Sequence, residues 1–266
     1  MRRFIASHVE VTGEIEQPHV RPWATVLRVP TAEGVCWFKA SRAAFAHEGR
    51  VLEVLRPLAP SLLPEVIAAT SEGCLLLADA GERAREHPVD WPAMLRRYAR
   101  LQQRSADATA RLLEAGAYDN RPERVVERIE ALTTWLPASV ERRLRARLPV
   151  VAERLHELAA SRLPATVDHG DLHDGNVFTR DGVVRLLDWG DSAVAHPFFS
   201  LTTAEPEEVS PYLDAWKGAA PREELAREAA LVMELRFLLR ALNWEHVAAL
   251  GEREHLVDRV ERFLVT

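Results

Sequence analysis

Residues 169–188 read HGDLHDGNVFTRDGVVRLLD, and this stretch decides the fold that we expect for the chain. Its first eight residues hold His169, Asp171 and Asn176 in the spacing H-x-D-x-x-x-x-N. An Asp-Gly pair then separates two short apolar runs, which is a β-hairpin signal. The hairpin would return Asp188 to the end where Asn176 lies. Carboxylate and amide oxygens gathered in this way suit a hard cation such as Mg²⁺, which commonly shares its site with substrate phosphates.

The same spacing fits a general arrangement for phosphoryl transfer, in which a catalytic loop H-R-D-x-x-x-x-N precedes a metal-binding aspartate. Asp171 would face the substrate hydroxyl, and Asn176 and Asp188 would hold Mg²⁺ on the nucleotide. HGDLHDGN followed by LLDWGD resembles the aminoglycoside phosphotransferase (APH)-like family of small-molecule kinases, which are relatives of the protein kinases. The resemblance extends over residues 20–250, most of the chain.

The resemblance implies an α+β, two-lobed protein-kinase-like fold. Residues 1–77 would form the N-terminal β-rich nucleotide-binding lobe, a small antiparallel sheet with one helix, and residues 78–81 would form the hinge. Residues 82–266 would form a mainly helical C-lobe that carries the catalytic loop and the acceptor site. ATP, or GTP in its place, would lie with Mg²⁺ in the cleft between the two lobes.

Lysine usage singles out one residue. Of the 34 Lys and Arg residues only Lys39 and Lys217 are lysines, which leaves 34 − 2 = 32 arginines. Lysine and arginine are not interchangeable at a phosphate, because lysine is a compact point charge. In the family a lysine at this place contacts the α/β-phosphates and pairs with a helical glutamate. The resemblance therefore implies a phosphate contact for Lys39, with Glu48 as its partner and Glu53 as the alternative partner.

The resemblance also implies nucleotide contacts that leave little side-chain signature. In the family adenine meets backbone groups just after a buried strand, here around Leu77, Ala78 and Asp79. The first hairpin turn, QPHVRP at residues 17–22, contains no glycine, so its mode of phosphate contact stays open. Relatives often carry an aspartate where this chain has Ser200, and the change is expected to weaken one structural hydrogen bond.

Apolar periodicity and turn residues predict the order of the elements. The strands are expected at 8–15, 23–29, 35–40, 62–69 and 73–78. The helices are expected at 41–55, with Ser41 as N-cap, and at 90–114, 122–132, 137–161, 209–216, 221–250 and 252–264. This order places a strand-rich segment before a helical one.

The composition is typical of a globular protein without membrane-spanning segments. The chain has 266 residues, 47% apolar and 28% charged, and no apolar run long enough to span a membrane. Its N-terminus lacks the apolar core of a signal peptide, and its two cysteines have no metal or disulfide spacing, so a cytoplasmic enzyme is expected. The net charge of −6 argues against a nucleic-acid partner. The expected partner is a small-molecule hydroxyl acceptor, with no membrane or nucleic acid, and the chain is a monomer or homodimer.

The charge distribution bears on the acceptor. Residues 189–266 contain 14 carboxylates and 8 Lys or Arg, a difference of six that equals the whole excess. Because relatives build the acceptor pocket from this part of the chain, the excess favours a cationic acceptor, such as an aminoglycoside or another amine-bearing antibiotic or metabolite. Antibiotic resistance would be one possible role. Trp216, Phe237 and Trp244 leave a bulky neutral acceptor as the alternative.

Two functions of other classes stay open. One is a nucleotide-binding pseudokinase-like module, although none of the expected catalytic residues is missing. The other is a metal-dependent hydrolase that uses the H-x-D-x-H-D cluster, whose candidate ligands are His169, Asp171, His173 and Asp174. Within the kinase interpretation, Asp171 is either a general base or a residue that positions the acceptor oxygen.

Overall fold

The computed structural model describes residues 1–266, and packing divides them into two compact units. The first comprises Met1–Val89 and Asp174–Gly190, and the second comprises Asp90–His173 and Asp191–Thr266. Asp171 therefore belongs to the second unit, whereas Asn176 and Asp188 belong to the first. The lobe boundaries expected at residues 77 and 82 stay a prediction, since units of packing need not coincide with the lobes around a nucleotide.

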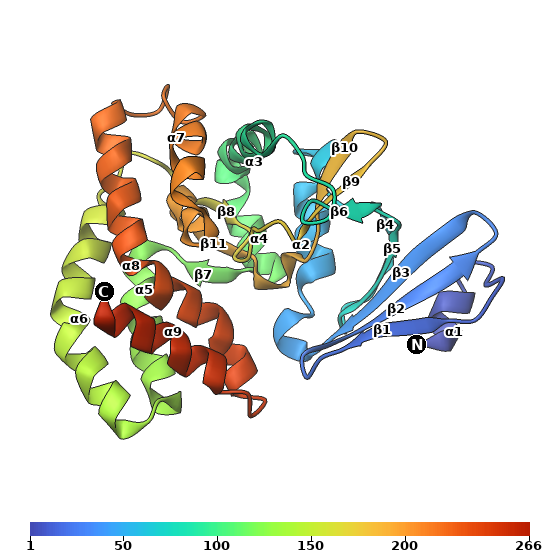
Figure 1. The fold of residues 1–266 in the computed structure, drawn as a ribbon, viewed down its shortest axis with the longest axis horizontal. Coiled ribbons are helices and arrows are strands. Elements are labelled where there is room, and N and C mark those ends of the chain that lie inside the picture. Colours follow the sequence, from blue (N-terminus) through green and yellow to red (C-terminus); the bar gives the residue numbers. More distant parts are fainter. The chain divides into compact units, whose positions relative to one another are not determined.

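A five-stranded antiparallel sheet lies in the first unit, with the order β1-β2-β3-β5-β4 (Figure 1). Its strands are β1 (Glu16–Val20), β2 (Ala24–Thr31), β3 (Gly34–Ser41), β4 (Val66–Ala69) and β5 (Cys74–Ala78). β2 and β3 pair continuously from Ala24 opposite Ser41 to Thr31 opposite Gly34, which confirms the turn expected between them. The centre of β5 is buried, as its continuous apolar run predicts.

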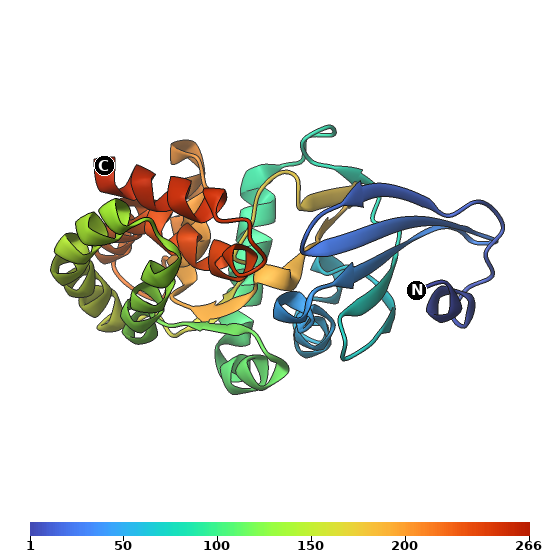
Figure 2. The same ribbon diagram turned by 90° about the horizontal axis from the view of Figure 1, so that it is seen from below.

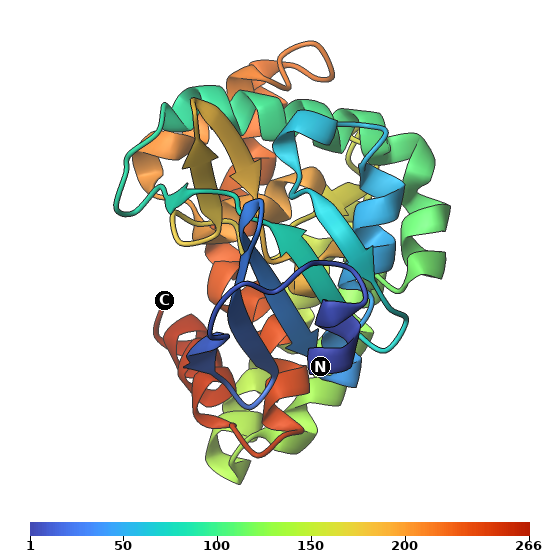
Figure 3. The ribbon, with the colours of Figure 1, turned by 90° about the vertical axis from the view of Figure 1, so that its right-hand side faces the viewer.

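The strand predicted over residues 8–15 is wrong. A short helix, α1 (Arg2–Ala6), precedes β1, and within 8–15 Val11 makes an isolated β-bridge to Thr31. The reason is packing: Ile5 is fully buried in an apolar cluster on the sheet, and several residues of 8–15 pack against that cluster. The cluster contains Ile5, Leu27, Val29, Cys36, Phe38 and Leu76. The apolar residues near the N-terminus therefore cover the sheet instead of extending it, and Figure 3 shows α1 beside the strands.

Helix α2 (Glu48–Leu55) begins seven residues after the expected start at Ser41. Ser41 is the last residue of β3, and its N–H donates to Gly73 O at 3.0 Å, so it continues the sheet and does not cap the helix. A 3-10 turn, Ala43–Phe45, leads from the strand to the helix. Glu48 is consequently the first residue of α2.

The hairpin predicted after Asn176 is present. β9 (Val177–Arg180) pairs with β10 (Val183–Leu186), and β6 (Glu82–Arg83) adds a third strand beside β9. The turn residues Asp181 and Gly182 have positive φ angles of 51° and 76°, as a two-residue type I′ turn requires. Gly81 permits the close approach of β6, because a Cβ there would lie 2.2 Å from Thr179 O.

The second unit combines helices with a small sheet in the order β7-β11-β8. Its strands are β7 (Tyr118–Asn120), β8 (Thr166–Asp168) and β11 (Ala193–Ala195). Its α-helices are α3 (Trp91–Ser105), α4 (Thr109–Ala115), α5 (Pro122–Leu132), α6 (Ala138–Ala159), α7 (Pro206–Asp214), α8 (Arg222–Ala248) and α9 (Glu254–Val265). β11 is buried at every residue, so the small sheet forms part of the core of this unit.

The helices of the second unit agree with the sequence pattern to within three residues except in one place. α5 has the predicted bounds, and a 3-10 turn at Ala106–Ala108 divides the single helix expected over 90–114 into α3 and α4. α8 and α9 pack against each other (Figure 2). The sheets and helices together confirm the predicted α+β fold class. None of the helices combines the length and the hydropathy needed to cross a membrane.

Candidate functional site

Lys39 is held between two carboxylates of the first unit. Its neighbour Phe38 is buried in the apolar cluster, so Lys39 points to the other face of the sheet. The Lys39 Nζ donates to Glu48 Oε2 at 2.7 Å and to Asp188 Oδ1 at 2.6 Å. The side chain of Glu48 is 2% exposed and that of Lys39 15%. The structure thus contains the predicted pair of Lys39 with Glu48 and adds Asp188 to it.

These carboxylates fix both the charge and the position of Lys39. Burial alone would lower the pKa of the Lys39 ammonium, but the charges of Asp188 and Glu48 raise it above its ordinary value. Glu48 also accepts a hydrogen bond from the Trp189 N–H at 3.0 Å. One buried carboxylate therefore links the cation on β3 to the segment that carries Asp188.

The hairpin returns Asp188 to Asn176, as the sequence predicts. Val177 pairs with Leu186, and the Leu187 N–H donates to Asn176 O at 2.9 Å. Asp188 has a left-handed backbone with φ of 65°, a conformation that is uncommon for residues other than glycine and recurs at functional sites. Its side chain is 53% exposed. A carboxylate and an amide oxygen so arranged fit the donor set of a hard cation.

Leu77 and Ala78 end β5, where the sequence places the adenine contacts. The Ala78 N–H already donates to Glu65 O at 2.9 Å, so a nucleotide could use this donor only by replacing that bond. The Asp79 carboxylate accepts a hydrogen bond from Trp37 Nε1 at 2.9 Å, which ties the end of β5 to β3. Adenine contacts at these three residues stay a prediction.

Asp171 follows β8 in the second unit and is ionised. Arg240 Nη2 of α8 lies 3.0 Å from Asp171 Oδ1, and His173 Nε2 lies 3.2 Å from Oδ2. Burial would raise the pKa of this carboxyl, but the hydrogen bond of His173 and the charge of Arg240 lower it to about 2. A carboxylate of such low pKa stays ionised and can accept a hydrogen bond, but it is a weak base. It therefore suits orientation of a hydroxyl better than removal of its proton.

Three contacts fix the backbone of the loop around Asp171. Asn243 Nδ2 of α8 donates to Gly170 O at 2.7 Å, and the His169 N–H donates to Tyr98 Oη at 2.9 Å. Gly170 has φ of 80°, and a Cβ there would lie 2.3 Å from Asp191 O. Only glycine tolerates both conditions, so a residue with a side chain could not replace the glycine of the H-G-D motif without moving the backbone.

A buried hydrogen-bond network lies directly before this loop. Asp168 is 5% exposed and accepts a hydrogen bond from Ser200 Oγ at 2.5 Å, and the Tyr98 hydroxyl lies 2.8 Å from the same Oγ. Ser200 thus makes hydrogen bonds to Asp168 and Tyr98 at the position where relatives often carry an aspartate. That its structural hydrogen bond is weaker than the one an aspartate would make stays a prediction. Burial raises the pKa of Asp168 to about 6, although the hydrogen bond from Ser200 opposes the shift.

This shift predicts a pH-dependent stability. The pKa of Asp168 rises from 3.8 to about 6 on folding, so the folded state holds the proton more tightly. The contribution of protonated Asp168 to the free energy of unfolding is complete below pH 3.8 and is lost as the pH rises through about 6. The change is about 3 kcal/mol. Since Asp168→Asn cannot ionise, its free energy of unfolding relative to the wild type should rise by about this amount between acid and neutral pH.

Urea unfolding of both proteins at several pH values measures the difference. The matched control is Asp181→Asn in the β9–β10 turn, where the side chain is 93% exposed. Its difference from the wild type should stay flat over the same pH range. A flat difference for Asp168→Asn as well would contradict the prediction.

The H-x-D-x-H-D cluster does not form a metal site in the structure. His169 is fully buried, and the Asp171 N–H lies 3.4 Å from its Nδ1. Asp174 belongs to the first unit and pairs with Arg85 at 2.8 Å. No group of three or more His, Cys, Asp or Glu side chains in the chain is placed to hold a metal ion.

Sequence reasoning missed Arg240 and Asn243, which contact the loop from α8. They lie 69 and 73 residues from their partners Asp171 and Gly170, so no local motif connects them. Their one signal is spacing, because polar residues at i and i+3 interrupt an otherwise buried stretch of the helix. That pattern indicates a shared helix face without identifying what the face contacts.

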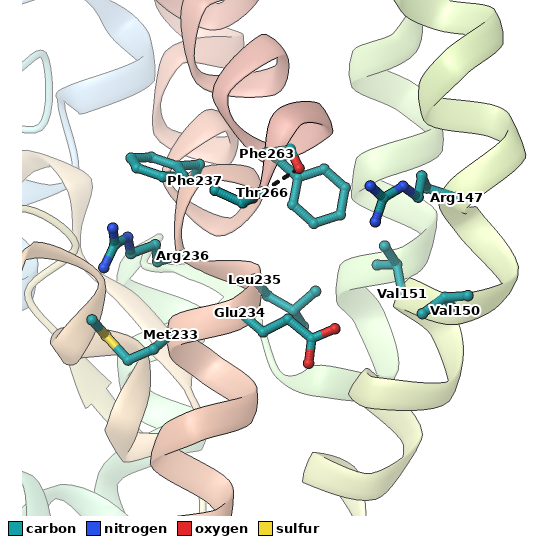
Figure 4. A pocket seen from close by; sticks show the side chains of 10 residues that line it. All are labelled: Arg147, Val150, Val151, Met233, Glu234, Leu235, Arg236, Phe237, Phe263 and Thr266. Atoms are coloured by element: carbon teal, nitrogen blue, oxygen red, sulfur yellow. Dashed lines mark hydrogen bonds between the residues drawn. The ribbon is translucent and has the colours of Figure 1, made fainter.

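A pocket of about 260 Å³ lies among α6, α8 and α9 (Figure 4). Figure 4 shows Arg147 and Arg236 on opposite sides of it, with the ring of Phe263 between them and the ring of Phe237 on the side of Arg236. Glu234, the one acidic side chain of the lining, lies 3.3 Å from Arg154 Nε. Of the residues named from the sequence, the lining contains only Phe237, one of the three aromatics considered for a bulky neutral acceptor, and its charged side chains are mainly cationic.

Comparison with known proteins gives the family. Residues 14–244 match the sequence model of the phosphotransferase enzyme family, whereas no curated protein sequence matches the chain. Among solved structures, macrolide 2′-phosphotransferase MphH from Brachybacterium faecium is 18% identical, covers 97% of this chain and 95% of its own, and has a TM-score of 0.64.

Two further solved structures have a similar fold. A choline/ethanolamine kinase family protein from Mesorhizobium loti is 15% identical, with coverage of 96% and 88% and a TM-score of 0.65. APH(2″)-IIia, in complex with GDP and kanamycin, is 13% identical, with coverage of 94% and 91% and a TM-score of 0.65. At these identities the structures establish the fold, and the family match over most of the sequence confirms that the chain belongs to the phosphotransferase enzyme family.

Proposed function

We propose that the protein transfers the γ-phosphate of ATP or GTP to a hydroxyl group of a small molecule in a Mg²⁺-dependent reaction. The observation that carries the proposal is the position of Lys39 between Glu48 and Asp188, at 2.7 Å and 2.6 Å. A buried glutamate that orients a charged lysine beside a metal-binding aspartate is the arrangement that phosphoryl transfer needs.

The first unit would bind the phosphates. Lys39 supplies a fixed positive charge for the α/β-phosphates, and Glu48 prevents its side chain from turning away. Asn176 and Asp188 are the residues that would hold Mg²⁺, through amide and carboxylate oxygens. When bound, Mg²⁺ neutralises charge on the phosphate oxygens. Glu48 connects these parts because it also accepts the Trp189 N–H.

Asp171 of the second unit would orient the acceptor. In the transfer, the acceptor oxygen bonds to the γ-phosphorus while the bond from that phosphorus to the β–γ bridging oxygen breaks. The nucleoside diphosphate leaves, and the hydroxyl proton passes to a phosphate oxygen or to solvent. With a pKa of about 2, Asp171 would hold the hydroxyl by accepting its hydrogen bond and would not retain the proton. Placement and charge neutralisation then supply most of the catalysis.

A screen tests the proposal. The purified protein is incubated with MgATP or MgGTP and a panel of hydroxyl compounds, and release of ADP or GDP is measured together with phosphorylated product. We expect product with at least one acceptor and none without Mg²⁺. Nucleotide binding with no turnover on any acceptor would favour a pseudokinase-like module. Stoichiometric zinc in the purified protein would favour the hydrolase instead.

A further inference from the structure

The charges around Asp171 are not balanced. Asp171 is one carboxylate, and Arg240 pairs with its Oδ1 at 3.0 Å. A second guanidinium belongs to Arg259 on α9, the helix that packs against α8, and the charges of Arg240 and Asp171 act on it. The packing of α9 on α8 thus adds a second guanidinium to this part of the unit.

Arg259 has no carboxylate of its own. It makes no ion pair within 4.0 Å, although it is partly buried. Burial lowers the pKa of its guanidinium, and the charges of Arg240 and Arg262 lower it further, against Asp258 and Asp171. The nearest acidic neighbour in sequence, Asp258, is already held by Arg262 at 3.0 Å. Arg259 thus keeps its charge without an ion-pair partner in the free protein.

The excess of positive charge continues along the contact of α8 and α9. The Arg236 guanidinium lies 4.7 Å from the centre of the Phe237 ring, and the Arg262 guanidinium lies 6.0 Å from the same centre. Arg236 and Arg240 are four residues apart on α8, so they share a helix face. We call Arg236, Arg240, Arg259 and Arg262 the basic strip. Within it Arg240 pairs with Asp171 and Arg262 pairs with Asp258, whereas Arg236 and Arg259 make no ion pair within 4.0 Å.

The acidic residues of this part of the chain do not offset the basic strip, because many are paired elsewhere. At least six of the fourteen carboxylates in residues 189–266 lie within 4.0 Å of a basic side chain. Five of these pairs lie outside the basic strip, namely Asp214–Arg222, Glu224–Arg162, Glu228–His196, Glu234–Arg154 and Glu245–Arg128. The sixth, Asp258–Arg262, lies within it. The total charge that favoured a cationic acceptor is therefore a poor guide to the charge beside Asp171.

We propose that Arg259 and Arg240 form an anion subsite, and that the acceptor carries a carboxylate or a phosphate ester near the hydroxyl that Asp171 orients. The inference rests on the proposed function and names the acceptor class for it. Guanidinium groups bind such oxyanions in a bidentate manner. We assign the bound anion to the acceptor and not to the nucleotide, because both arginines belong to the same unit as Asp171. The residues proposed for the nucleotide, Lys39, Asn176 and Asp188, belong to the other unit.

The first experiment measures binding without turnover. Inorganic phosphate is titrated into the full chain by calorimetry, for the wild type and for Arg259→Gln. We expect the substitution to weaken phosphate binding by about tenfold or more. It should not unfold the protein, because it removes a charge that has no partner, and thermal unfolding checks this. The matched control is Arg253→Gln at the start of α9, whose guanidinium lies 5.2 Å from the Trp135 ring centre.

The second experiment compares acceptors. Sets of alcohols that differ only in a carboxylate, a phosphate ester, an amine or no charged group are tested for phosphorylation. The ratio of kcat/KM for anionic over neutral acceptors should exceed one and should fall about tenfold in Arg259→Gln, through KM. Equal kcat/KM for all sets, or a matching loss of MgATP hydrolysis without any acceptor, would overturn the inference. The latter result would assign the arginines to the phosphoryl group.

The two proposals fail in different ways. If no alcohol is phosphorylated but inorganic phosphate still binds through Arg259, the phosphotransferase activity is wrong and the anion subsite stands. If neutral or amine-bearing alcohols are phosphorylated equally well by the wild type and Arg259→Gln, the activity stands and the subsite is wrong.

Discussion

Asp171→Ala is expected to lower kcat by a factor of about 10² to 10⁴, because the acceptor hydroxyl loses the carboxylate that orients it. Nucleotide binding should change little, since the residues proposed for the phosphates and for Mg²⁺ belong to the other unit. The loss should therefore appear in kcat for the acceptor found in the screen, with the dissociation constant of the nucleotide preserved. Near-normal turnover would show that the kinase assignment is wrong.

The pH profile separates orientation from base catalysis. The pKa of Asp171 is about 2, so the group stays ionised through neutral and alkaline pH and should add no limb to the rate profile between about pH 5 and pH 9. Asp171→Asn keeps one oxygen that can accept a hydrogen bond. It should retain more activity than Asp171→Ala, with the same pH dependence as the wild type. A limb near neutral pH that disappears in Asp171→Asn would instead identify a general base.

Arg240 pairs with one oxygen of Asp171 in the free protein, so the acceptor hydroxyl must bind a carboxylate that already has a partner. A carboxylate oxygen has two lone pairs, so a hydroxyl can share Oδ1 or Oδ2 without displacing a neighbour. The pairing with Arg240 and His173 thus prepares the carboxylate for the acceptor by fixing its direction before binding.

Local chemistry explains what the sequence could predict. The hairpin follows from Asp181-Gly182 between two apolar runs, and it brings Asp188 back to Asn176. The pair of Lys39 and Glu48 spans nine residues, within reach of a strand followed by a helix, and the scarcity of lysine drew attention to it. In each case a short stretch of chain contains all the necessary information.

Contacts between distant segments were not predictable in this way. Arg240, Asn243 and Arg259 come from the last two helices, and their relation to Asp171 depends on how those helices pack. Net charge has the same limit, since it does not tell which carboxylates already have partners, and the cationic acceptor stays a prediction. The strand predicted over residues 8–15 is wrong because alternation of apolar residues also fits a segment that packs across a sheet. The N-terminal residues pack in this way, as the burial of Ile5 shows.

Burial also changes what is expected of Lys39. From its place at the end of a strand, replacing it would cost little stability. In the structure it is the cation of Glu48, whose side chain is 2% exposed. Removing one partner of a buried pair leaves an uncompensated charge, which costs about 3–5 kcal/mol. Lys39→Ala should therefore lose nearly all phosphotransfer and also lower the free energy of unfolding by roughly this amount.

The double variant separates the two effects. In Lys39→Ala/Glu48→Gln no uncompensated carboxylate remains at position 48, and the amide can still accept the Trp189 N–H. Its free energy of unfolding should recover much of the loss, and the coupling energy of the cycle should lie within about 0.5–3 kcal/mol. Phosphotransfer should not recover, because the charge on the phosphates is still missing. Lys217→Ala, which removes the exposed second lysine, is the control and should behave as the wild type. If Lys39→Ala were as stable and as active as that control, Lys39 would be a solvated lysine without a role in phosphate binding.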